Sequence, residues 1–305
     1  MIKFIVRRLV AAVLTLLVVS VIVFLAVRVA GDPRNYLLPE TATPEQYELL
    51  GQRLGLDQPL VVQYGKYLSQ VLVGDFGTSL SHRRPTMDVI ADRVPATVFL
   101  AVVAFALAAV VGFGMGVLSA VRRGSRLDKA MQVTALTGQA IPSFWLGIIM
   151  IFFFSVHLKW FPPSGMREPT SFVLPSIALA WFFIAANLRL MRSSMLDVLD
   201  TEYIKLARAK GLSNRSIIWK HAVRNALLPP LTFAGVTLGS LVTGSLVIET
   251  VFAWPGLGKL AIDAVFAADY ALLQGVVLVF TVMYMIASLI VDVLYATLDP
   301  RVRLT

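Results

Sequence analysis

Residues 202–230 read EYIKLARAKGLSNRSIIWKHAVRNALLPP and separate two apolar segments of the chain. The stretch is basic, and it is compatible with helix on both sides of Gly211. Glycine readily adopts the left-handed conformation that ends helices, and Ser213 can cap a second helix over 214–226. The sequence therefore predicts a helix, a tight turn and a second helix, which together form a surface suited to docking a soluble partner.

Apolar segments on both sides of this stretch and elsewhere decide the fold class. The 305-residue chain is 57% hydrophobic and contains six long runs without Asp, Glu, Lys or Arg. A transmembrane helix needs roughly 20 apolar residues, and a charge at its centre costs about 2.5–3.5 kcal/mol. The runs lack the alternating pattern of a membrane β-barrel. We expect an all-α integral membrane protein with six transmembrane helices at 9–27, 96–121, 130–158, 171–191, 226–248 and 270–296, and a cytoplasmic loop at 192–225.

The first span is expected to stay in the mature protein. Lys3, Arg7 and Arg8 precede an apolar run that is longer than the core of a typical signal peptide. Arg28 stands where a signal peptidase would require a small residue. We therefore interpret residues 9–27 as an uncleaved helix.

The distribution of positive charge predicts the orientation of the spans. The segments expected on one side carry 17 Lys and Arg and 6 acids, whereas those on the other side carry 10 and 12. Short cytoplasmic loops are enriched in Lys and Arg, so both termini are expected in the cytoplasm. The net charge of +9 then reflects topology rather than affinity for nucleic acid. A loop lying on anionic lipid would explain the charge of 202–230, but not a glycine turn between two capped helices.

The segment 28–95 is expected outside the cell and is too long for a bare connection. Thr43 and Gln46 form a capping-box pattern with proline at the first helical position, and this helix should end near Gly55. A second helix is expected over 59–74 and a third near 85–94. The subdomain is interpreted either as a lid on the helices or as a platform for an external partner, and the two are compatible.

Other patterns exclude several kinds of chemistry. The chain has no cysteine, which excludes disulfides, thiol chemistry and cysteine-based metal sites. Its three histidines are scattered and form no metal-ligand set. The string GLGKL at 256–260 lacks the first glycine and the Ser or Thr of a phosphate loop. We expect no cofactor, no metal and no ATP site in this chain.

Glycine and proline inside the spans predict how the helices pack. The pairs Gly112/Gly116 and Gly235/Gly239 have the small-xxx-small spacing that allows two helices to approach closely. Pro142 is expected to kink the third span, either statically or as part of a gate.

The stretch quoted first resembles the cytoplasmic coupling loop of ABC importer permeases, in which Glu-Ala-Ala, three residues and a glycine are followed by Ile-x-Leu-Pro. Only Ala207 and Gly211 match that general pattern strictly. The strings ARAKGL at 207–212 and HAVRNALLP at 221–229 instead resemble the permease subunits of dipeptide and oligopeptide importers.

This second resemblance extends along nearly the whole chain. Strings in the expected order resemble the first external loop, the third span, the loop after the fifth span and the C-terminal tail of these permeases. They are LGLDQPL at 54–60, GDFGTS at 74–79, AIPSFW at 140–145, ETVFAWPGLG at 249–258 and DPR at 299–301.

The resemblance implies a type I importer permease fold and a set of partners. These are a second homologous permease forming a heterodimer, two cytoplasmic ATPases, an extracytoplasmic substrate-binding protein and membrane lipid. The chain itself would be no enzyme, because the ATPases hydrolyse ATP and drive alternating access in the bacterial cytoplasmic membrane. The residues that would couple to an ATPase are Ala207, Arg208, Lys210, Gly211, Leu212 and Ser213.

The cargo and its pathway are less directly encoded. Dipeptides or oligopeptides are the expected cargo, and a nickel chelate, glutathione, an oligosaccharide or heme are alternatives for the same machine. A secondary transporter or a membrane enzyme is disfavoured, because no Asp or Glu lies in the middle of a span and no nucleophile–base pair is present. Polar residues that could line the pathway or bond between helices are Gln139, Ser143, Asn187 and Gln274.

Overall fold

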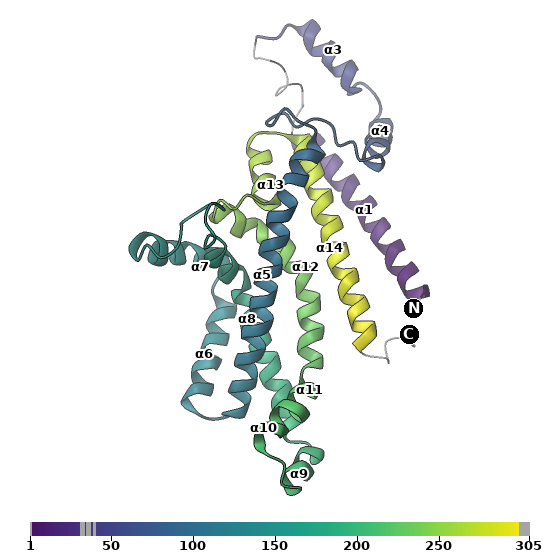
Figure 1. Ribbon diagram of the computed structural model, residues 1–305. Helices are drawn as coiled ribbons and strands as arrows, with labels where there is room; N and C mark the ends of the chain where they lie inside the picture. Colours follow the sequence, from purple (N-terminus) through teal and green to yellow (C-terminus); the bar gives the residue numbers. More distant parts are fainter. Residues whose placement is uncertain (1, 31–33, 35–37, 39–40, 299–305) are drawn as a thin grey trace. The chain divides into compact units, whose positions relative to one another are not determined.

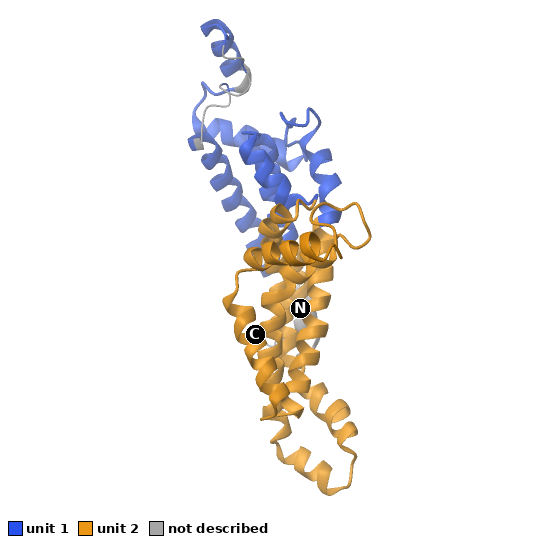
Figure 2. Ribbon diagram, turned by 90° about the vertical axis from the view of Figure 1, so that its left-hand side faces the viewer, with its two compact units in different colours: residues 1–96, 255–285 blue, residues 97–254, 286–305 orange. Residues whose placement is uncertain are grey.

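The computed structural model describes residues 2–30, 34, 38 and 41–298, and the regular elements among them are helices (Figure 1). The chain forms two compact units (Figure 2). Unit 1 contains residues 1–96 and 255–285, and unit 2 contains residues 97–254 and 286–305. The expected DPR string at 299–301 lies outside the described residues.

Unit 1 contains the first span and the segment that follows it. Its helices are α1 (Ile2–Ala30), α3 (Pro44–Leu54), α4 (Leu60–Leu72), α13 (Leu257–Phe266) and the first parts of α5 (Thr86–Val121) and α14 (Tyr270–Leu298). Aromatic rings join α1 to α4, with Phe24 in edge contact with Tyr64 at 5.5 Å between ring centroids. The hydroxyls of Ser20 and Tyr64 share a hydrogen bond of 2.8 Å.

The short helices of unit 1 begin and end where the sequence predicts. Thr43 caps α3, with the reciprocal bonds of a capping box to Gln46. Gly55 ends this helix in the left-handed conformation, at φ 64°. The third expected helix, near 85–94, is instead the first part of α5. Pro95 lies inside α5 without ending it. A proline in a helix removes one backbone hydrogen bond, but the residues on both sides of Pro95 are compatible with helix.

Unit 2 is organised around α8 (Val173–Leu199), which packs against α6, α7, α11 and α12. The packing elements are α6 (Arg126–Ala140), α7 (Ser143–Met150) with its π-helical continuation η1 (Ile151–His157), and α12 (Leu228–Val251). Between α8 and α12 lie α9 (Glu202–Ala209), α10 (Asn214–Ser216), the π-helix η2 (Ile217–Ala222) and α11 (Val223–Ala226). The helix expected over 214–226 is therefore present, with a π-helical centre.

Glycines allow the helices of unit 2 to approach closely. A Cβ at Gly112 would lie 2.6 Å from the Cβ of Asn187, and one at Gly116 would lie 2.6 Å from that of Met191. A Cβ at Gly138 would lie 2.5 Å from the Cβ of Ala185. Since real Cβ atoms do not come this close, α5 and α6 can pack on α8 only through these glycines. The close packing expected from the Gly112/Gly116 spacing is confirmed.

The expected third span is bent. The helices α6 and α7–η1 meet at 107° across Ile141 and Pro142. Proline lacks the N–H that would continue α6, and it sets an extended conformation in the residue before it, here Ile141 at ψ 121°. Among the described residues, five helices are long and apolar enough to cross a membrane, or six if this bent pair counts as one span. The expected all-α membrane fold is confirmed, and the kink at Pro142 is far sharper than a bend in a continuous helix.

Candidate functional site

The stretch quoted first forms a turn at the end of unit 2 opposite α7 (Figures 1 and 2). Here α9 is followed by Gly211, whose φ of 77° lies in the left-handed region. The hydroxyl of Ser213 then accepts a hydrogen bond from the backbone N–H of Ser216 and caps the next helix. The helix, turn and second helix predicted for this stretch are confirmed.

One face of α9 is packed into the protein. Ile204 is fully buried and Ala207 is 8% exposed, and both belong to a cluster with residues of α5, α8, η2 and α11. The small side chain of Ala207 lets α9 lie against the chain's own core. The burial fixes α9 to α8, so the turn is held by packing on a long helix.

The opposite face of α9 is open to solvent and partly apolar. Tyr203, Leu206 and Leu212 are 42%, 57% and 42% exposed. The cations of Arg208 and Lys210 are also exposed. We call these residues, with Gly211 and Ser213, the 202–213 surface. From the sequence alone, the glycine and the cations of this surface were identified, but Tyr203 and Leu206 were missed. The spacing of these two residues from Lys210, which follows α9 directly, is the signal that could have found them.

A buried ion pair holds the other loop at this end of unit 2. Arg192 of α8 donates two hydrogen bonds to Asp128 at the start of α6, at 2.9 Å and 3.0 Å. Ser119 and the backbone N–H of Gly124 also donate to this carboxylate. Asp128 is 2% exposed, so its charge is neutralised entirely by protein groups. The cluster joins α5, α6 and α8 below the 202–213 surface.

The four polar residues considered for a pathway lie in different surroundings. Gln139 is exposed on α6 and accepts a hydrogen bond of 2.7 Å from Nη1 of Arg189. Asn187 is buried between helices and donates to the carbonyl of Ala108 at 3.2 Å. Ser143 begins α7, whereas Gln274 belongs to unit 1. The structure therefore joins Gln139 to a cation of the neighbouring helix α8.

In unit 1, a buried carboxylate connects the GDFGTS loop to α14. Asp269 accepts hydrogen bonds from the hydroxyls of Ser79 and Ser81, at 2.6 Å and 2.8 Å, and from the backbone N–H of Leu272. Burial raises the pKa of the Asp269 carboxyl, but these hydrogen bonds outweigh burial and hold that pKa below its ordinary value. Asp269 is thus ionised at neutral pH and anchors the loop to the first turn of α14.

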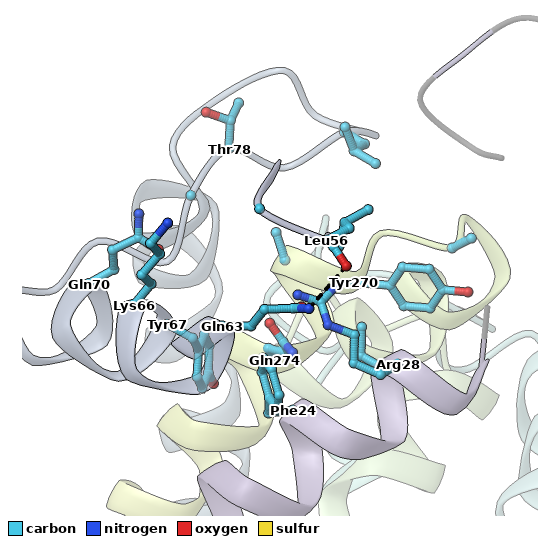
Figure 3. A pocket seen from close by; sticks show the side chains of 16 residues that line it. Phe24, Arg28, Leu56, Gln63, Lys66, Tyr67, Gln70, Thr78, Tyr270 and Gln274 are labelled. Carbon is cyan, nitrogen blue, oxygen red and sulfur yellow. Dashed lines mark hydrogen bonds between the residues drawn. The ribbon is translucent and has the colours of Figure 1, made fainter. Parts of the chain in front are cut away.

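A pocket of about 480 Å³ opens in unit 1 between α1, α4, the GDFGTS loop and α14 (Figure 3). Its lining includes the cations Arg28 and Lys66 and the amides of Gln63, Gln70 and Gln274. Burial raises the pKa of Tyr67, another lining residue, to about 12. The lining therefore combines polar and apolar side chains, and it contains no carboxylate among the described residues.

A third buried carboxylate lies near the end of the fifth span. Glu249 is fully buried near the end of α12 and accepts hydrogen bonds from Thr97 at 2.8 Å and Ser245 at 3.0 Å. The chain after it turns sharply, with Ala253 at φ 45° and Trp254 buried. The ETVFAWPGLG string is thus a structural element at the end of a span. Because Glu249 is partnered at a helix end, it does not provide the carboxylate in mid-span that an ion-coupled transporter would need.

Comparison with known proteins relates this architecture to a protein family. The model of the family described as "Binding-protein-dependent transport system inner membrane component" matches residues 112–304, and that of its N-terminal region matches residues 1–101. The chain belongs to this family. It is a multi-pass permease of an ABC importer in the inner membrane, and it is not itself an enzyme.

Relatives of known sequence place this permease among those of the dipeptide and oligopeptide type. It is 40% identical to the glutathione transport system permease proteins GsiC of Salmonella paratyphi A (strain ATCC 9150 / SARB42) and of Escherichia coli (strain K12). Each alignment covers 99% of both chains. The resemblance identified from sequence strings is confirmed. The family implies partners of two kinds, an ATPase and a substrate-binding protein.

Solved structures confirm the fold. A chain of the inward-facing MetNI methionine ABC transporter matches with a TM-score of 0.59 and 21% identity, covering 70% of this permease and 97% of that chain. A chain of an amino acid ABC transporter with histidines matches with a TM-score of 0.55 and 14% identity, covering 69% and 94%. Likeness at this level of identity shows that the fold is that of a type I importer permease.

Proposed function

We propose that this permease is one half of a heterodimer that imports dipeptides or oligopeptides by alternating access. Two cytoplasmic ATPases would dock on the two permeases, and an extracytoplasmic protein would deliver the cargo. The observation that supports the proposal best is the 202–213 surface, which is exposed, partly apolar, basic and rigidly joined to α8 through Ile204 and Ala207.

The shape of this surface suits mechanical coupling. Exposed apolar side chains with a rim of cations are typical of the surfaces that bind protein partners. Because α9 packs against η2, which contacts α8, a push on the turn is carried to the span that packs against α6, α7 and α12. Arg208 and Lys210 can pair with acidic residues of an ATPase. Contact with lipid headgroups is the alternative role for these cations.

The cargo within this proposal is a peptide. The sequence strings resemble peptide permeases, while the named relatives carry glutathione, itself a small peptide-like molecule. Glutathione is therefore the alternative cargo that a specific observation favours. A competition assay distinguishes them: if the cargo is a general peptide, excess glutathione should leave most uptake of trialanine unchanged.

Uptake should depend on the whole assembly. Purified alone, the permease is expected to show no ATPase activity and no concentrative uptake, because it carries no phosphate-binding loop. Reconstituted in liposomes with its second permease, the ATPases and the binding protein, it should accumulate trialanine when ATP is supplied. Measurement of nucleotide hydrolysis and of labelled trialanine tests both statements. Concentrative uptake by the isolated permease would contradict the proposal.

The orientation can be tested independently of transport. We expect both termini and the 202–213 surface in the cytoplasm, and α3 outside. Because the chain has no cysteine, substitutions Gln52→Cys and Ser213→Cys each introduce one unique label site. An impermeant maleimide should label the first in sealed cells and the second only after the membrane is opened. Labelling of both sites in sealed cells would contradict the topology.

A further inference from the structure

One arginine lies inside a membrane-crossing helix and is exposed. Arg189 is on α8, far from the end of the helix at Leu199, and it donates to Gln139 on α6. At about 1.5 Å per residue, Gln139 lies about 20 Å along α6 from Arg126. The hydrocarbon core of a bilayer is about 30 Å thick, so the guanidinium lies well within that depth.

Lipid is a poor neighbour for this side chain. Ionisable side chains within membrane spans almost always face the interior of the helix bundle or a water-filled cavity. Arg189 is exposed and reaches Gln139 near the far end of α6. We therefore place this side chain in a water-filled cavity.

The groups around this guanidinium are donors. Arg189 has five N–H groups, and among the described residues its one hydrogen-bond acceptor is the amide oxygen of Gln139, which leaves the amide N–H groups of Gln139 available. The buried indole N–H of Trp181, beside Gly138, has no acceptor among the described residues. No ion pair of Arg189 is found in the described part of the chain, whereas Arg192, on the next turn, is paired with Asp128.

Such a set matches a carboxylate. The fork of a guanidinium binds the two oxygens of a carboxylate with parallel hydrogen bonds, and charged bonds of this kind are about twice as strong as neutral ones. The C-terminus of α6, which lies nearby, contributes a partial negative charge of about half an elementary charge. Arg189 carries a full positive charge, so the net charge at this place is positive. The N-terminus of α7 begins at Ser143, at the same bend, and contributes a partial charge of opposite sign.

We propose that Arg189 and Gln139 bind a carboxylate of the cargo inside the translocation pathway. The inference rests on the proposed function and specifies its substrate class, namely peptides with a free C-terminal carboxylate. Glutathione has carboxylates as well, whereas neutral oligosaccharides have none. The site selects for the charged end of the peptide and leaves the side chains of the cargo unconstrained.

The test measures binding to the assembled, nucleotide-free transporter in the absence of the binding protein. Equilibrium dialysis with labelled trialanine and with its C-terminal amide gives the two dissociation constants. Wild type should bind the acid about tenfold or more tightly than the amide. Arg189→Gln should weaken binding of the acid about tenfold, leave binding of the amide within about twofold, and so remove the discrimination.

Two further variants keep the test decisive. Gln139→Glu places a carboxylate against Arg189 and should produce the same selective loss of acid binding, without removing the cation. Arg126→Gln, which removes an exposed arginine at the start of the same helix pair, should leave both constants unchanged. Elution of each assembled variant as a single species by size exclusion shows that it is folded.

The possible results separate the two proposals. Equal weakening of acid and amide, or unchanged discrimination in Arg189→Gln, would overturn the carboxylate site and assign Arg189 to contact with the second permease. The proposed function would stand in that case if wild type still takes up trialanine. Failure of wild type to transport trialanine at all would overturn the proposed function and the inference with it.

Discussion

Replacement of Gly211 by valine is expected to abolish coupled peptide uptake without removing the protein from the membrane. Gly211 has φ of 77°, a conformation that a β-branched residue adopts only at a cost of about 1–3 kcal/mol. Apart from its chain neighbours, no described residue has an atom within 4 Å of where this Cβ would lie, so the expected damage arises from a rearranged backbone and from added volume toward the ATPase. Uptake of labelled trialanine and trialanine-stimulated ATPase activity of the assembled transporter measure the effect.

A matched substitution separates backbone strain from volume. Asparagine tolerates the left-handed region better than other residues with a side chain, so Gly211→Asn should retain the turn and lose much less uptake than Gly211→Val. The spans are far from this position in the sequence, and both variants should reach the membrane in wild-type amounts. Wild-type uptake and stimulation in Gly211→Val would show that the 202–213 surface is a basic loop on lipid instead of the coupling element.

Removal of Asp128 is expected to be the most destabilising single change at the end of unit 2. Asp128→Ala leaves Arg192, whose side chain is 22% exposed, without its charge partner, and it also removes the acceptor for Ser119 and Gly124. Loss of one partner from a buried ion pair typically costs about 3–5 kcal/mol. We expect a marked fall in the melting temperature of the detergent-solubilised permease. Size-exclusion chromatography of samples heated to increasing temperatures measures this fall.

Two further variants serve as controls for the ion pair between Asp128 and Arg192. The double variant Asp128→Ala with Arg192→Met removes the unpaired charge and should recover part of the loss. The variant Asp200→Ala breaks an exposed pair with Arg123, whose atoms are 4.0 Å apart, and should change the melting temperature very little. An effect of Asp128→Ala as small as that of Asp200→Ala would show that water replaces Asp128 as the partner of Arg192.

The sequence predicted features that depend on neighbouring residues. Thr43 and Ser213 cap helices, and Gly55 and Gly211 end them, because each of these conformations is set by a few adjacent residues. Hydrophobic runs similarly indicate spans, because the thickness of the bilayer sets the length that a spanning helix needs. The family resemblance rested on such local strings, and it covers nearly the whole chain.

Features that depend on distant residues were not predictable in this way. Asp128 and Asp269 read as loop charges, and their burial follows only from the positions of Arg192 and Ser79. Arg189 lies within the span expected at 171–191, but its hydrogen bond to Gln139 depends on how α8 packs against α6.

The bend at Pro142 has a consequence for the lipid around this permease. With 15 residues, α6 rises only about 22 Å, less than the thickness of the hydrocarbon core. Beyond it the chain turns by 107°, so acyl chains at this side meet the flank of α7 and η1, where Phe144, Trp145 and Phe152 are exposed. The bilayer must thin locally to match this shorter apolar height. Lipids with shorter acyl chains should therefore gather beside α6, and membrane thickness becomes one of the conditions that set the energy of the transport cycle.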